Sequence, residues 1–304
     1  MLVLLKVDNV TKRFGQLTAV EKLSFSVNRG EVLGIVEQNG AGKSTTFKMI
    51  LNFLVPDQGR ITIDNRELDE KILNKIGFLP EERGLYFNMS IKEQILYFAR
   101  LHAYNGKQAE RELPFWMNAL AVKGNEETLI KDLSKGNQQK VQLITALIHH
   151  PQLVILDEPF SGLDPVNIGL LIEIVKKLRQ EGAAVIFSSH NMKNVSEVSD
   201  KILMLVDGKQ RLYGPINEIR AAFGRNKVYL EGVFNDIAIE RITGVEKIVD
   251  DYPGKIITFD SERHARDVVD LAKQCDSLQG YRLLPPTLDD IFCMITESEV
   301  ARHG

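Results

Sequence analysis

The chain has 304 residues, which is long enough for a large hydrophobic core and for two domains. Hydrophobic residues make up 44% and charged residues 26% of the sequence, which is an ordinary composition for a soluble protein. The net charge of −3 provides no overall attraction to nucleic acid, so no nucleic-acid partner is expected.

The N-terminal segment MLVLLKVDNV starts with apolar residues but lacks the basic leader and small-residue cleavage site of a signal peptide. We interpret it as the beginning of a strand. No apolar run approaches the length that spans a bilayer. The two cysteines, Cys275 and Cys293, are therefore expected to be reduced thiols in a cytosolic protein, with a disulfide as the alternative.

Residues 4–14 and 17–27 alternate apolar and polar side chains, as half-buried strands do. Residues 30–37 form a more continuous apolar run, which is typical of a buried parallel strand. A helix is predicted over residues 43 to about 54, and an edge strand over residues 60–64.

The middle third of the chain has apolar residues at helical spacing over residues 90–104, 111–122 and 136–150. Ser90 and Glu93 match the capping box that begins a helix. This helical segment has the character of an insertion into the α/β pattern on either side.

Strands are predicted again at residues 152–159 and 183–190, separated by a helix over residues 167–182. Strands that alternate with helices indicate an α/β fold with a parallel sheet. We expect the inserted helical subdomain to cover about residues 84–150.

The charge changes near residue 220. Residues 221–304 carry ten Lys and Arg against fifteen Asp and Glu, whereas the first 220 residues carry 28 against 26. The elements predicted beyond residue 225 follow the order β-α-β-β-α-β, which matches a small ferredoxin-like α+β unit. The first helix of that unit is expected over residues 235–242. The sequence thus predicts two domains, residues 1–220 and 225–304.

The stretch GIVEQNGAGKSTT, residues 34–46, has the features of a phosphate-binding loop between a buried strand and a helix. Gly40 and Gly42 allow backbone N–H groups to approach a phosphate closely. Lys43 adds a positive charge for the outer phosphates, and the Ser44 hydroxyl is suited to ligate Mg²⁺. The helix that follows presents its positive end to the same anion.

The stretch LVILDEP places Asp157 and Glu158 after a buried strand. Acids at this end of a strand lie at the ligand-binding edge of an open α/β sheet. Asp157 is predicted to hold Mg²⁺ through water, and Glu158 to polarise the attacking water as a general base. Two solvated turn acids are the alternative, and the phosphate-binding loop argues against it.

Three further stretches accompany these motifs: LSKGNQQ at residues 133–139, SGLD at 161–164 and FSSHN at 187–191. Together with the loop and ILDEP, in this order along the chain, they resemble the nucleotide-binding subunit of an ABC transporter. The resemblance covers most of residues 1–220. It implies a P-loop NTPase fold that binds ATP and Mg²⁺ and hydrolyses ATP between two copies of the domain.

The resemblance also implies roles for individual residues. Ser134 and Gly136 would contact the γ-phosphate of ATP held by a second copy, and Asp164 would communicate between the two sites. His190 would touch the γ-phosphate and help to position the water, and Phe14 would stack on adenine. The residues that hold ATP within one copy would be those of the loop: Asn39, Gly40, Ala41, Gly42, Lys43, Ser44 and Thr45.

Some residues depart from the family pattern. Glu81 stands where most members carry Gln as an Mg²⁺ ligand, and it is expected to ligate Mg²⁺ with one more negative charge. Lys135 and Asn137 replace the usual Gly and Gln. The stretches PEERGLY and PPTLDDIF resemble a bacterial subgroup with an added C-terminal domain, whose members pair with separate export permeases, including sodium-efflux-type systems.

The partners implied are a separate transmembrane permease, docked near residues 81–100, and a second ATPase subunit in a homodimer or heterodimer. The chain would then lie peripherally at the cytoplasmic face of the membrane. One alternative is a soluble ABC-type ATPase that acts on the ribosome or DNA. Another is a regulatory subunit that binds ATP but hydrolyses it weakly.

Glu37 stands where the phosphate-loop pattern requires glycine. A carboxylate pointing into the loop would repel the phosphates, at a cost of up to about 4 kcal/mol at 4 Å. We therefore expect the Glu37 side chain to point away from the phosphates and ATP to bind despite it, with an engineered or degenerate substitution as the alternative.

Overall fold

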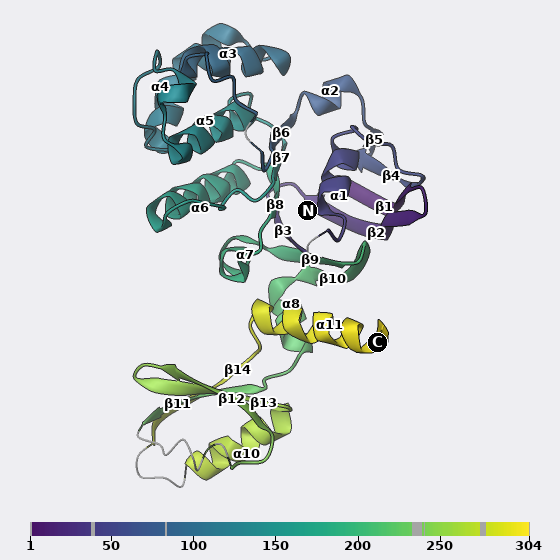
Figure 1. Ribbon diagram of the computed structural model, residues 1–304, viewed down its shortest axis with the longest axis vertical. Coiled ribbons are helices and arrows are strands. Elements are labelled where there is room, and N and C mark those ends of the chain that lie inside the picture. Colours follow the sequence, from purple (N-terminus) through teal and green to yellow (C-terminus); the bar gives the residue numbers. More distant parts are fainter. Residues whose placement is uncertain are drawn as a thin grey trace. The chain divides into compact units, whose positions relative to one another are not determined.

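The computed structural model describes residues 2–37, 40–82, 84–232, 239, 241–273 and 278–303. The chain divides into two compact units, residues 1–214 and 215–304. The first unit is built around a ten-stranded sheet and the second around a four-stranded sheet (Figure 1). No helix in the described ranges is long and apolar enough to cross a membrane.

One side of the large sheet is antiparallel, in the order β5-β4-β1-β2. Its strands are β1 (Val3–Phe14), β2 (Leu17–Asn28), β4 (Gln58–Ile63) and β5 (Arg66–Glu67). The alternating patterns in β1 and β2 place their apolar side chains in the core, because successive side chains of a strand point to opposite faces. The edge strand predicted over residues 60–64 corresponds to β4. Its position at the edge is wrong, because the short β5 pairs with β4 and forms the edge of the sheet.

The other side continues in the order β10-β9-β3-β8-β7-β6, and the pairs from β9 to β6 are parallel. These strands are β3 (Val32–Glu37), β6 (Ile76–Leu79), β7 (Leu153–Leu156), β8 (Ala184–Ser188), β9 (Lys201–Val206) and β10 (Lys209–Pro215). All residues of β3, β7 and β8 are buried, as expected for parallel strands covered on both faces. Because β3, β8 and β7 pair in parallel, their carboxyl ends lie at the same edge of the sheet.

Helices α1 (Lys43–Ile50), α6 (Pro165–Gln180) and α7 (Met192–Val198) pack against the sheet, and the short α2 (Glu70–Leu73) precedes β6 in the chain. Helix α1 ends earlier than predicted, at Ile50. The core between the layers contains large, fully buried side chains such as Phe47, Ile35 and Leu33. The α/β fold class predicted from the sequence is confirmed.

The helical subdomain consists of α3 (Ile91–Leu101), α4 (Gly106–Ala119), η1 (Ile130–Asp132) and α5 (Lys135–Leu147), and α3, α4 and α5 lie together in Figure 1. The capping box predicted at Ser90 and Glu93 is confirmed, because each side chain accepts the other residue's backbone N–H. Helix α4 begins before the predicted start, since the Asn105 side chain caps it.

The second unit contains α8 (Ile216–Ala222), β11 (Lys227–Gly232), β12 (Val245–Asp251), β13 (Gly254–Phe259), α10 (Glu262–Ala272), β14 (Leu278–Leu284) and α11 (Leu288–His303). Its strands pair antiparallel in the order β12-β13-β11-β14, which is the ferredoxin-like order. Most of the helix predicted over residues 235–242 lies outside the described residues, as does Cys275. Cys293 is a free thiol.

Candidate functional site

The phosphate-binding loop connects the carboxyl end of β3 to α1. Gly42 lies in the left-handed region with φ of 104°, and a Cβ there would come within 2.5 Å of the Ala19 carbonyl oxygen. Only glycine fits this position. The Gly42 carbonyl accepts both the backbone N–H and the hydroxyl of Thr46, each at 2.9 Å, which fixes the first turn of the helix. Gly40 and Ser44 are exposed, while Asn39 lies outside the described residues.

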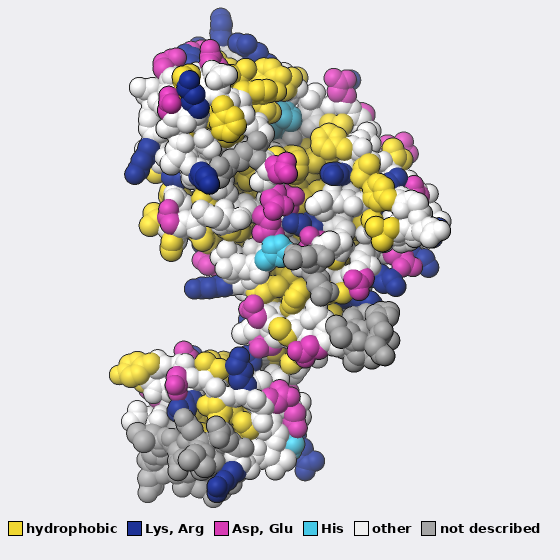
Figure 2. Space-filling model, in the orientation of Figure 1, with side chains coloured by type: hydrophobic (Ala, Val, Ile, Leu, Met, Phe, Trp, Pro, Cys, Tyr) yellow, Lys and Arg dark blue, Asp and Glu magenta, His cyan; other side chains and the backbone are white. Residues whose placement is uncertain are grey.

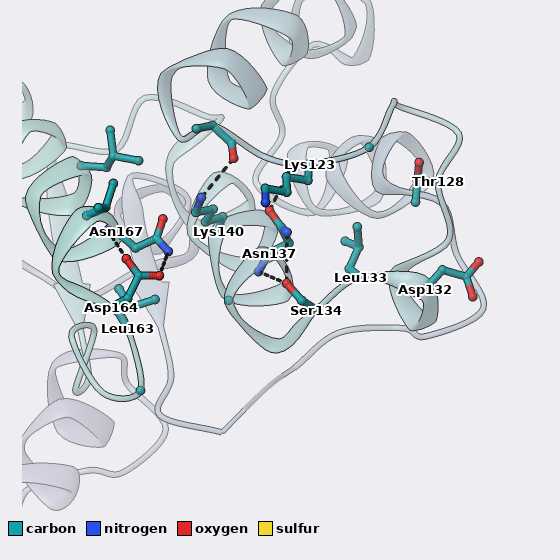
Figure 3. Close-up of a pocket in the computed structure, with 16 residues that line it drawn as sticks. Lys123, Thr128, Asp132, Leu133, Ser134, Asn137, Lys140, Leu163, Asp164 and Asn167 are labelled. Carbon is teal, nitrogen blue, oxygen red and sulfur yellow. Dashed lines mark hydrogen bonds between the residues drawn. The ribbon is translucent and has the colours of Figure 1, made fainter.

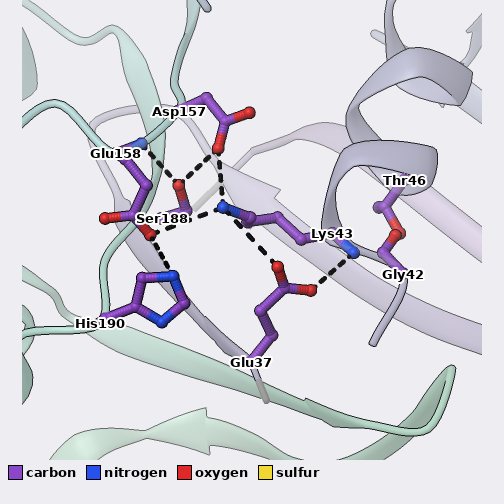
Figure 4. A network of polar contacts seen from close by, with 8 residues as sticks. All are labelled: Glu37, Gly42, Lys43, Thr46, Asp157, Glu158, Ser188 and His190. Atoms are coloured by element: carbon purple, nitrogen blue, oxygen red, sulfur yellow. Dashed lines mark hydrogen bonds and ion pairs between the residues drawn. The ribbon is translucent and has the colours of Figure 1, made fainter. Parts of the chain in front are cut away.

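Lys43 lies at the centre of a buried network of charges (Figure 4). Its ammonium Nζ is 3.0 Å from Asp157 Oδ1, 3.5 Å from Glu158 Oε1 and 3.7 Å from Glu37 Oε1. Burial alone would lower the pKa of Lys43, but the three carboxylates outweigh it and the pKa is raised. Lys43 is therefore a fully charged cation at the bottom of the site.

Glu37 points into the loop, so the expectation that it points away from the phosphates is wrong. Its Oε2 accepts the backbone N–H of Lys43 at 3.0 Å, and the residue is 8% exposed. Glu37 is the last residue of β3, paired with Leu205 of β9, and the side chain extends from that fixed backbone toward α1. Burial raises the pKa of the Glu37 carboxyl, and the Lys43 N–H and ammonium partly oppose this rise.

The two acids after β7 are held by a residue that sequence reasoning missed. The Ser188 hydroxyl, at the end of β8, donates to Asp157 Oδ1 at 2.8 Å and accepts the Glu158 N–H at 2.8 Å. Ser188 is fully buried. The only sequence signal was its place directly before Ser189 and His190 in FSSHN. The parallel pairing of β7 with β8 brings the two strand ends together.

Glu158 has a left-handed backbone, with φ of 48°, which is uncommon for a residue with a side chain. Such strain is found at functional sites, where the surrounding structure imposes it. Its Oε1 lies 3.3 Å from Nε2 of His190, a half-exposed side chain that follows β8. The structure therefore brings together Lys43, Asp157, Glu158 and His190, as the sequence motifs suggested.

A second surface contains the LSKGNQQ and SGLD stretches (Figure 3). Ser134 caps α5, and its hydroxyl oxygen accepts both the backbone N–H of Asn137, at 3.4 Å, and the side-chain Nδ2 of Asn137, at 3.1 Å. Asp164 caps α6 through Asn167 and is exposed. These residues and Gly136 line an open pocket of about 1010 Å³.

Two predicted residues lie outside these groups. Glu81 is exposed on the loop after β6, and within the described part of the chain it shares no hydrogen bond or ion pair with the Lys43 network. The backbone of that loop is held by Gln142, whose Nε2 lies 3.4 Å from the Pro80 carbonyl oxygen and 3.1 Å from that of Glu82. Phe14 is half exposed at the end of β1, with Lys12 Nζ 5.8 Å from its ring centre.

Comparison with known proteins is consistent with this arrangement. The ABC transporter family model matches residues 20–161, and the model of the DrrA1-3-like ATP-binding protein C-terminal domain matches residues 214–296. The chain is 37% identical over 289 residues to the ABC transporter ATP-binding protein YhaQ of Bacillus subtilis, covering 95% of this chain and 97% of YhaQ. The chain belongs to the family of ABC transporter ATP-binding subunits.

Two further proteins extend the comparison. The bacitracin transport ATP-binding protein BcrA of Bacillus licheniformis is 30% identical over 240 residues, which cover 78% of this chain and 76% of BcrA. A structure of the ATP-binding cassette MJ0796, a dimer bound to ADP and phosphate, matches with a TM-score of 0.63 and 25% identity. That match covers 70% of this chain and 98% of the cassette.

Proposed function

We propose that the chain binds and hydrolyses Mg-ATP between two ATPase subunits and thereby drives a separate membrane permease. One observation supports this proposal most directly. At the carboxyl ends of three parallel strands, Lys43 lies within ion-pair distance of Asp157 and Glu158, and Glu158 lies beside His190. A phosphate-binding lysine and two acids at this edge form the arrangement needed for phosphoryl transfer to water.

The residues of the site would have three roles: binding the phosphates, accepting a proton and positioning the attacking water. Backbone N–H groups from residue 40 to residue 45 would bind the phosphates at the positive end of α1, and Lys43 would neutralise the outer phosphates. Glu158 would accept a proton from the attacking water as the general base. His190, 3.3 Å from Glu158, would hold that water or the γ-phosphate in place.

The oxygen donors at the site suit Mg²⁺. The Ser44 hydroxyl is exposed at the start of α1, and Asp157 supplies a carboxylate that Ser188 orients. No three His, Cys, Asp or Glu side chains gather as a metal site in the described part of the chain. The nucleotide phosphates would therefore have to complete the ligand set, as is usual for this ion. Bound Mg²⁺ would neutralise charge that develops on the phosphates.

The surface that contains Ser134 and Asp164 supports the proposal that two subunits bind ATP between them. Because its hydroxyl oxygen accepts two N–H groups from Asn137, Ser134 retains its own proton for donation outward. Such a donor at the start of α5 suits the γ-phosphate of ATP held by another subunit. The dimeric cassette bound to ADP and phosphate supports this arrangement. Asp164, at the edge of the same pocket, would contact the second subunit.

An apolar groove in the first unit supports docking of a permease. Phe78, Phe98 and Leu101 are among the residues lining this groove of about 380 Å³, which lies near the loop that carries Glu81. Figure 2 shows exposed apolar side chains on this part of the surface. Phe53, which lines the groove, is exposed, as are Tyr86 and Phe87 in the loop that follows β6. The Nod factor export ATP-binding protein I of Sinorhizobium fredii, which is 28% identical to this chain over 304 residues, favours export as the direction of transport.

The catalytic assignment is tested with Glu158→Gln, which keeps the shape of the side chain but removes the base. This variant should bind Mg-ATP, lose at least about a hundredfold in phosphate release and accumulate as an ATP-bound dimer in size-exclusion chromatography. Glu173→Gln on the exposed face of α6 is the control and should behave as native. Normal turnover by Glu158→Gln would show that the general base lies elsewhere.

The permease assignment is tested with Leu101→Asp, at a groove residue that is 56% exposed. Capture of the membrane chain on the tagged ATPase should fall while Mg-ATP binding is retained. Tyr252→Asp, at a fully exposed position of the second unit, is the matched control. Equal capture by both variants would exclude this groove as the docking surface.

One observation favours a second candidate function, a regulatory subunit that hydrolyses ATP weakly. Glu37 occupies an N–H group of the phosphate-binding loop. A turnover assay of the native chain, with the Glu158→Gln variant as background, distinguishes an active ATPase from such a subunit.

A further inference from the structure

The Glu37 carboxylate lies where a phosphate oxygen would be expected to bind. The N–H of Lys43 is the first of α1, at the helix end that carries the positive half of the helix dipole. Glu37 Oε2 accepts that N–H at 3.0 Å, while Oε1 lies 3.7 Å from the Lys43 ammonium (Figure 4). One side chain therefore contacts both the backbone and the side-chain cation of the same residue.

This contact is a consequence of how the strand ends. The whole of β3 is buried, and the backbone of Glu37 is still paired with Leu205 of β9. The side chain thus starts from a fixed point and is 8% exposed. A glycine at this position, as in the usual phosphate-loop pattern, would leave the Lys43 N–H open to a ligand.

Charge around Lys43 is unbalanced. Three carboxylates, from Glu37, Asp157 and Glu158, lie within 3.7 Å of a single ammonium group. Asp157 and Glu158 have further partners in Ser188 and His190. The two groups that Glu37 contacts, the N–H and the ammonium of Lys43, are those that a bound polyphosphate needs.

We propose that Glu37 is an internal competitor for the phosphates of the nucleotide and sets the affinity of the site. The nucleotide has to displace the carboxylate from the Lys43 N–H and ammonium before its own phosphates can bind there. This inference rests on the proposed function, because it concerns the same ATP site. It assigns a role to the one residue of the loop that departs from the phosphate-binding pattern.

The alternative is that Glu37 serves only as a structural ion-pair partner of Lys43. The two roles predict opposite results. A structural partner would weaken nucleotide binding when removed, because Lys43 would lose its orientation. A competitor would strengthen binding when removed, because the N–H and the ammonium would become available.

The test is a titration of the full chain with a fluorescent ATP analogue in Mg²⁺, followed by displacement with inorganic pyrophosphate. Glu37→Gly removes the side chain, and Glu37→Gln keeps its size without the charge. Both variants should bind the analogue and pyrophosphate roughly 10- to 100-fold more tightly than the native chain, since each loses a charged hydrogen-bond competitor. Lys43→Ala should lose binding.

Glu31→Gln is the matched control. Glu31 is also a buried acid that accepts a backbone N–H, from Asn28 at 2.8 Å, and pairs with a lysine, Lys201 at 2.9 Å. Glu31 directly precedes β3, at the end away from the phosphate-binding loop, so loss of its charge should change the melting temperature but not nucleotide affinity. Melting curves of all variants establish that each one is folded.

Four outcomes overturn the inference. If the Glu37 variants bind more weakly than the native chain, Glu37 is a structural partner of Lys43. If both Glu37 variants bind as the native chain does while Lys43→Ala loses binding, Glu37 does not compete and the ATP-site proposal stands. If only Glu37→Gly gains affinity, the effect is one of size and not of charge. If no chain binds the analogue, including folded Glu37→Gly, the ATP-site proposal fails together with this inference.

Discussion

The Ser188 hydroxyl, at the end of β8, donates a hydrogen bond to Oδ1 of Asp157, which follows the neighbouring strand β7. The two oxygen atoms are 2.8 Å apart. The Ser188 oxygen also accepts the Glu158 N–H, so one buried hydroxyl orients two adjacent acids. Ser188→Ala should lower phosphate release by about tenfold or more while ATP binding changes little, because supporting hydrogen bonds orient the groups that act. Ser199→Ala, which removes a hydroxyl oxygen that has no partner among the described residues, should leave turnover unchanged. Equal turnover in both variants would remove Ser188 from this role.

Asn137 is predicted to position Ser134 for the second subunit. Its Nδ2 donates to Ser134 Oγ, and its Oδ1 accepts the Lys123 N–H at 2.9 Å. Asn137→Asp keeps the acceptor for Lys123 but loses the donor for Ser134. We expect the ATP-bound dimer of a Glu158→Gln background to weaken by roughly tenfold, because a hydrogen bond is lost and a negative charge added near the phosphate site.

The dimer fraction is measured by light scattering across a series of protein concentrations. Asn105→Asp, at the cap of α4, is the matched control and should leave dimer formation unchanged. Unchanged dimerisation in Asn137→Asp would contradict the positioning role of this residue.

Gly42→Ala should abolish nucleotide binding and destabilise the first unit. The added Cβ would meet the Ala19 carbonyl oxygen at 2.5 Å, and the φ of 104° would be strained. The expected loss is about 2 kcal/mol or more of unfolding free energy. Gly182→Ala has a similar φ of 91° with no atom within 4 Å of the Cβ, so it separates backbone strain from the steric clash. Comparable melting temperatures for the two variants would show that the clash is relieved.

A stacked histidine pair, in which His149 is buried and His102 is partly buried, should make the first unit less stable in acid. The rings of His102 and His149 stack with their centres 3.9 Å apart. Burial lowers the pKa of both, that of His149 to about 3, and the repulsion between the two rings adds to the shift of His149. The unfolded chain takes up these protons near pH 6.5 while the folded chain does not, so the free energy of unfolding falls as the pH drops from 6.5 toward 3.

Between pH 6.5 and pH 5, the lowered pKa of His149 alone should reduce the free energy of unfolding by roughly 2 kcal/mol. Urea unfolding at pH 7.5 and pH 5.0, followed by the fluorescence of the single tryptophan, Trp116, measures the loss. His149→Gln should reduce the difference in unfolding free energy between the two pH values, and His150→Gln, at a half-exposed position, is the control. The same difference in the native chain and in His149→Gln would rule out this contribution.

Much of the site was predictable because its residues occur in short stretches that also set local structure. The glycines before Lys43 allow the tight turn of the loop and let backbone N–H groups approach a phosphate. The acids at positions 157 and 158 follow a run of buried strand residues. The α/β class followed from strands alternating with helices, and the second unit from the order of its short elements. The strands β6, β9 and β10 were not predicted, since these short runs become strands only by pairing within the sheet.

The sequence by itself therefore determined the family, the strand-loop-helix at residues 34–46 and the acids that belong with it, because local patterns of glycine, apolar and charged residues encode them. The tertiary structure decided where the Glu37 carboxylate points, which hydroxyl orients Asp157 and Glu158, and that Glu81 lies apart from Lys43. The physical reason is that a side chain's direction depends on groups brought near it by distant strands. For Glu37, pairing of β3 with β9 holds the backbone, and the Lys43 N–H and ammonium attract the carboxylate inward.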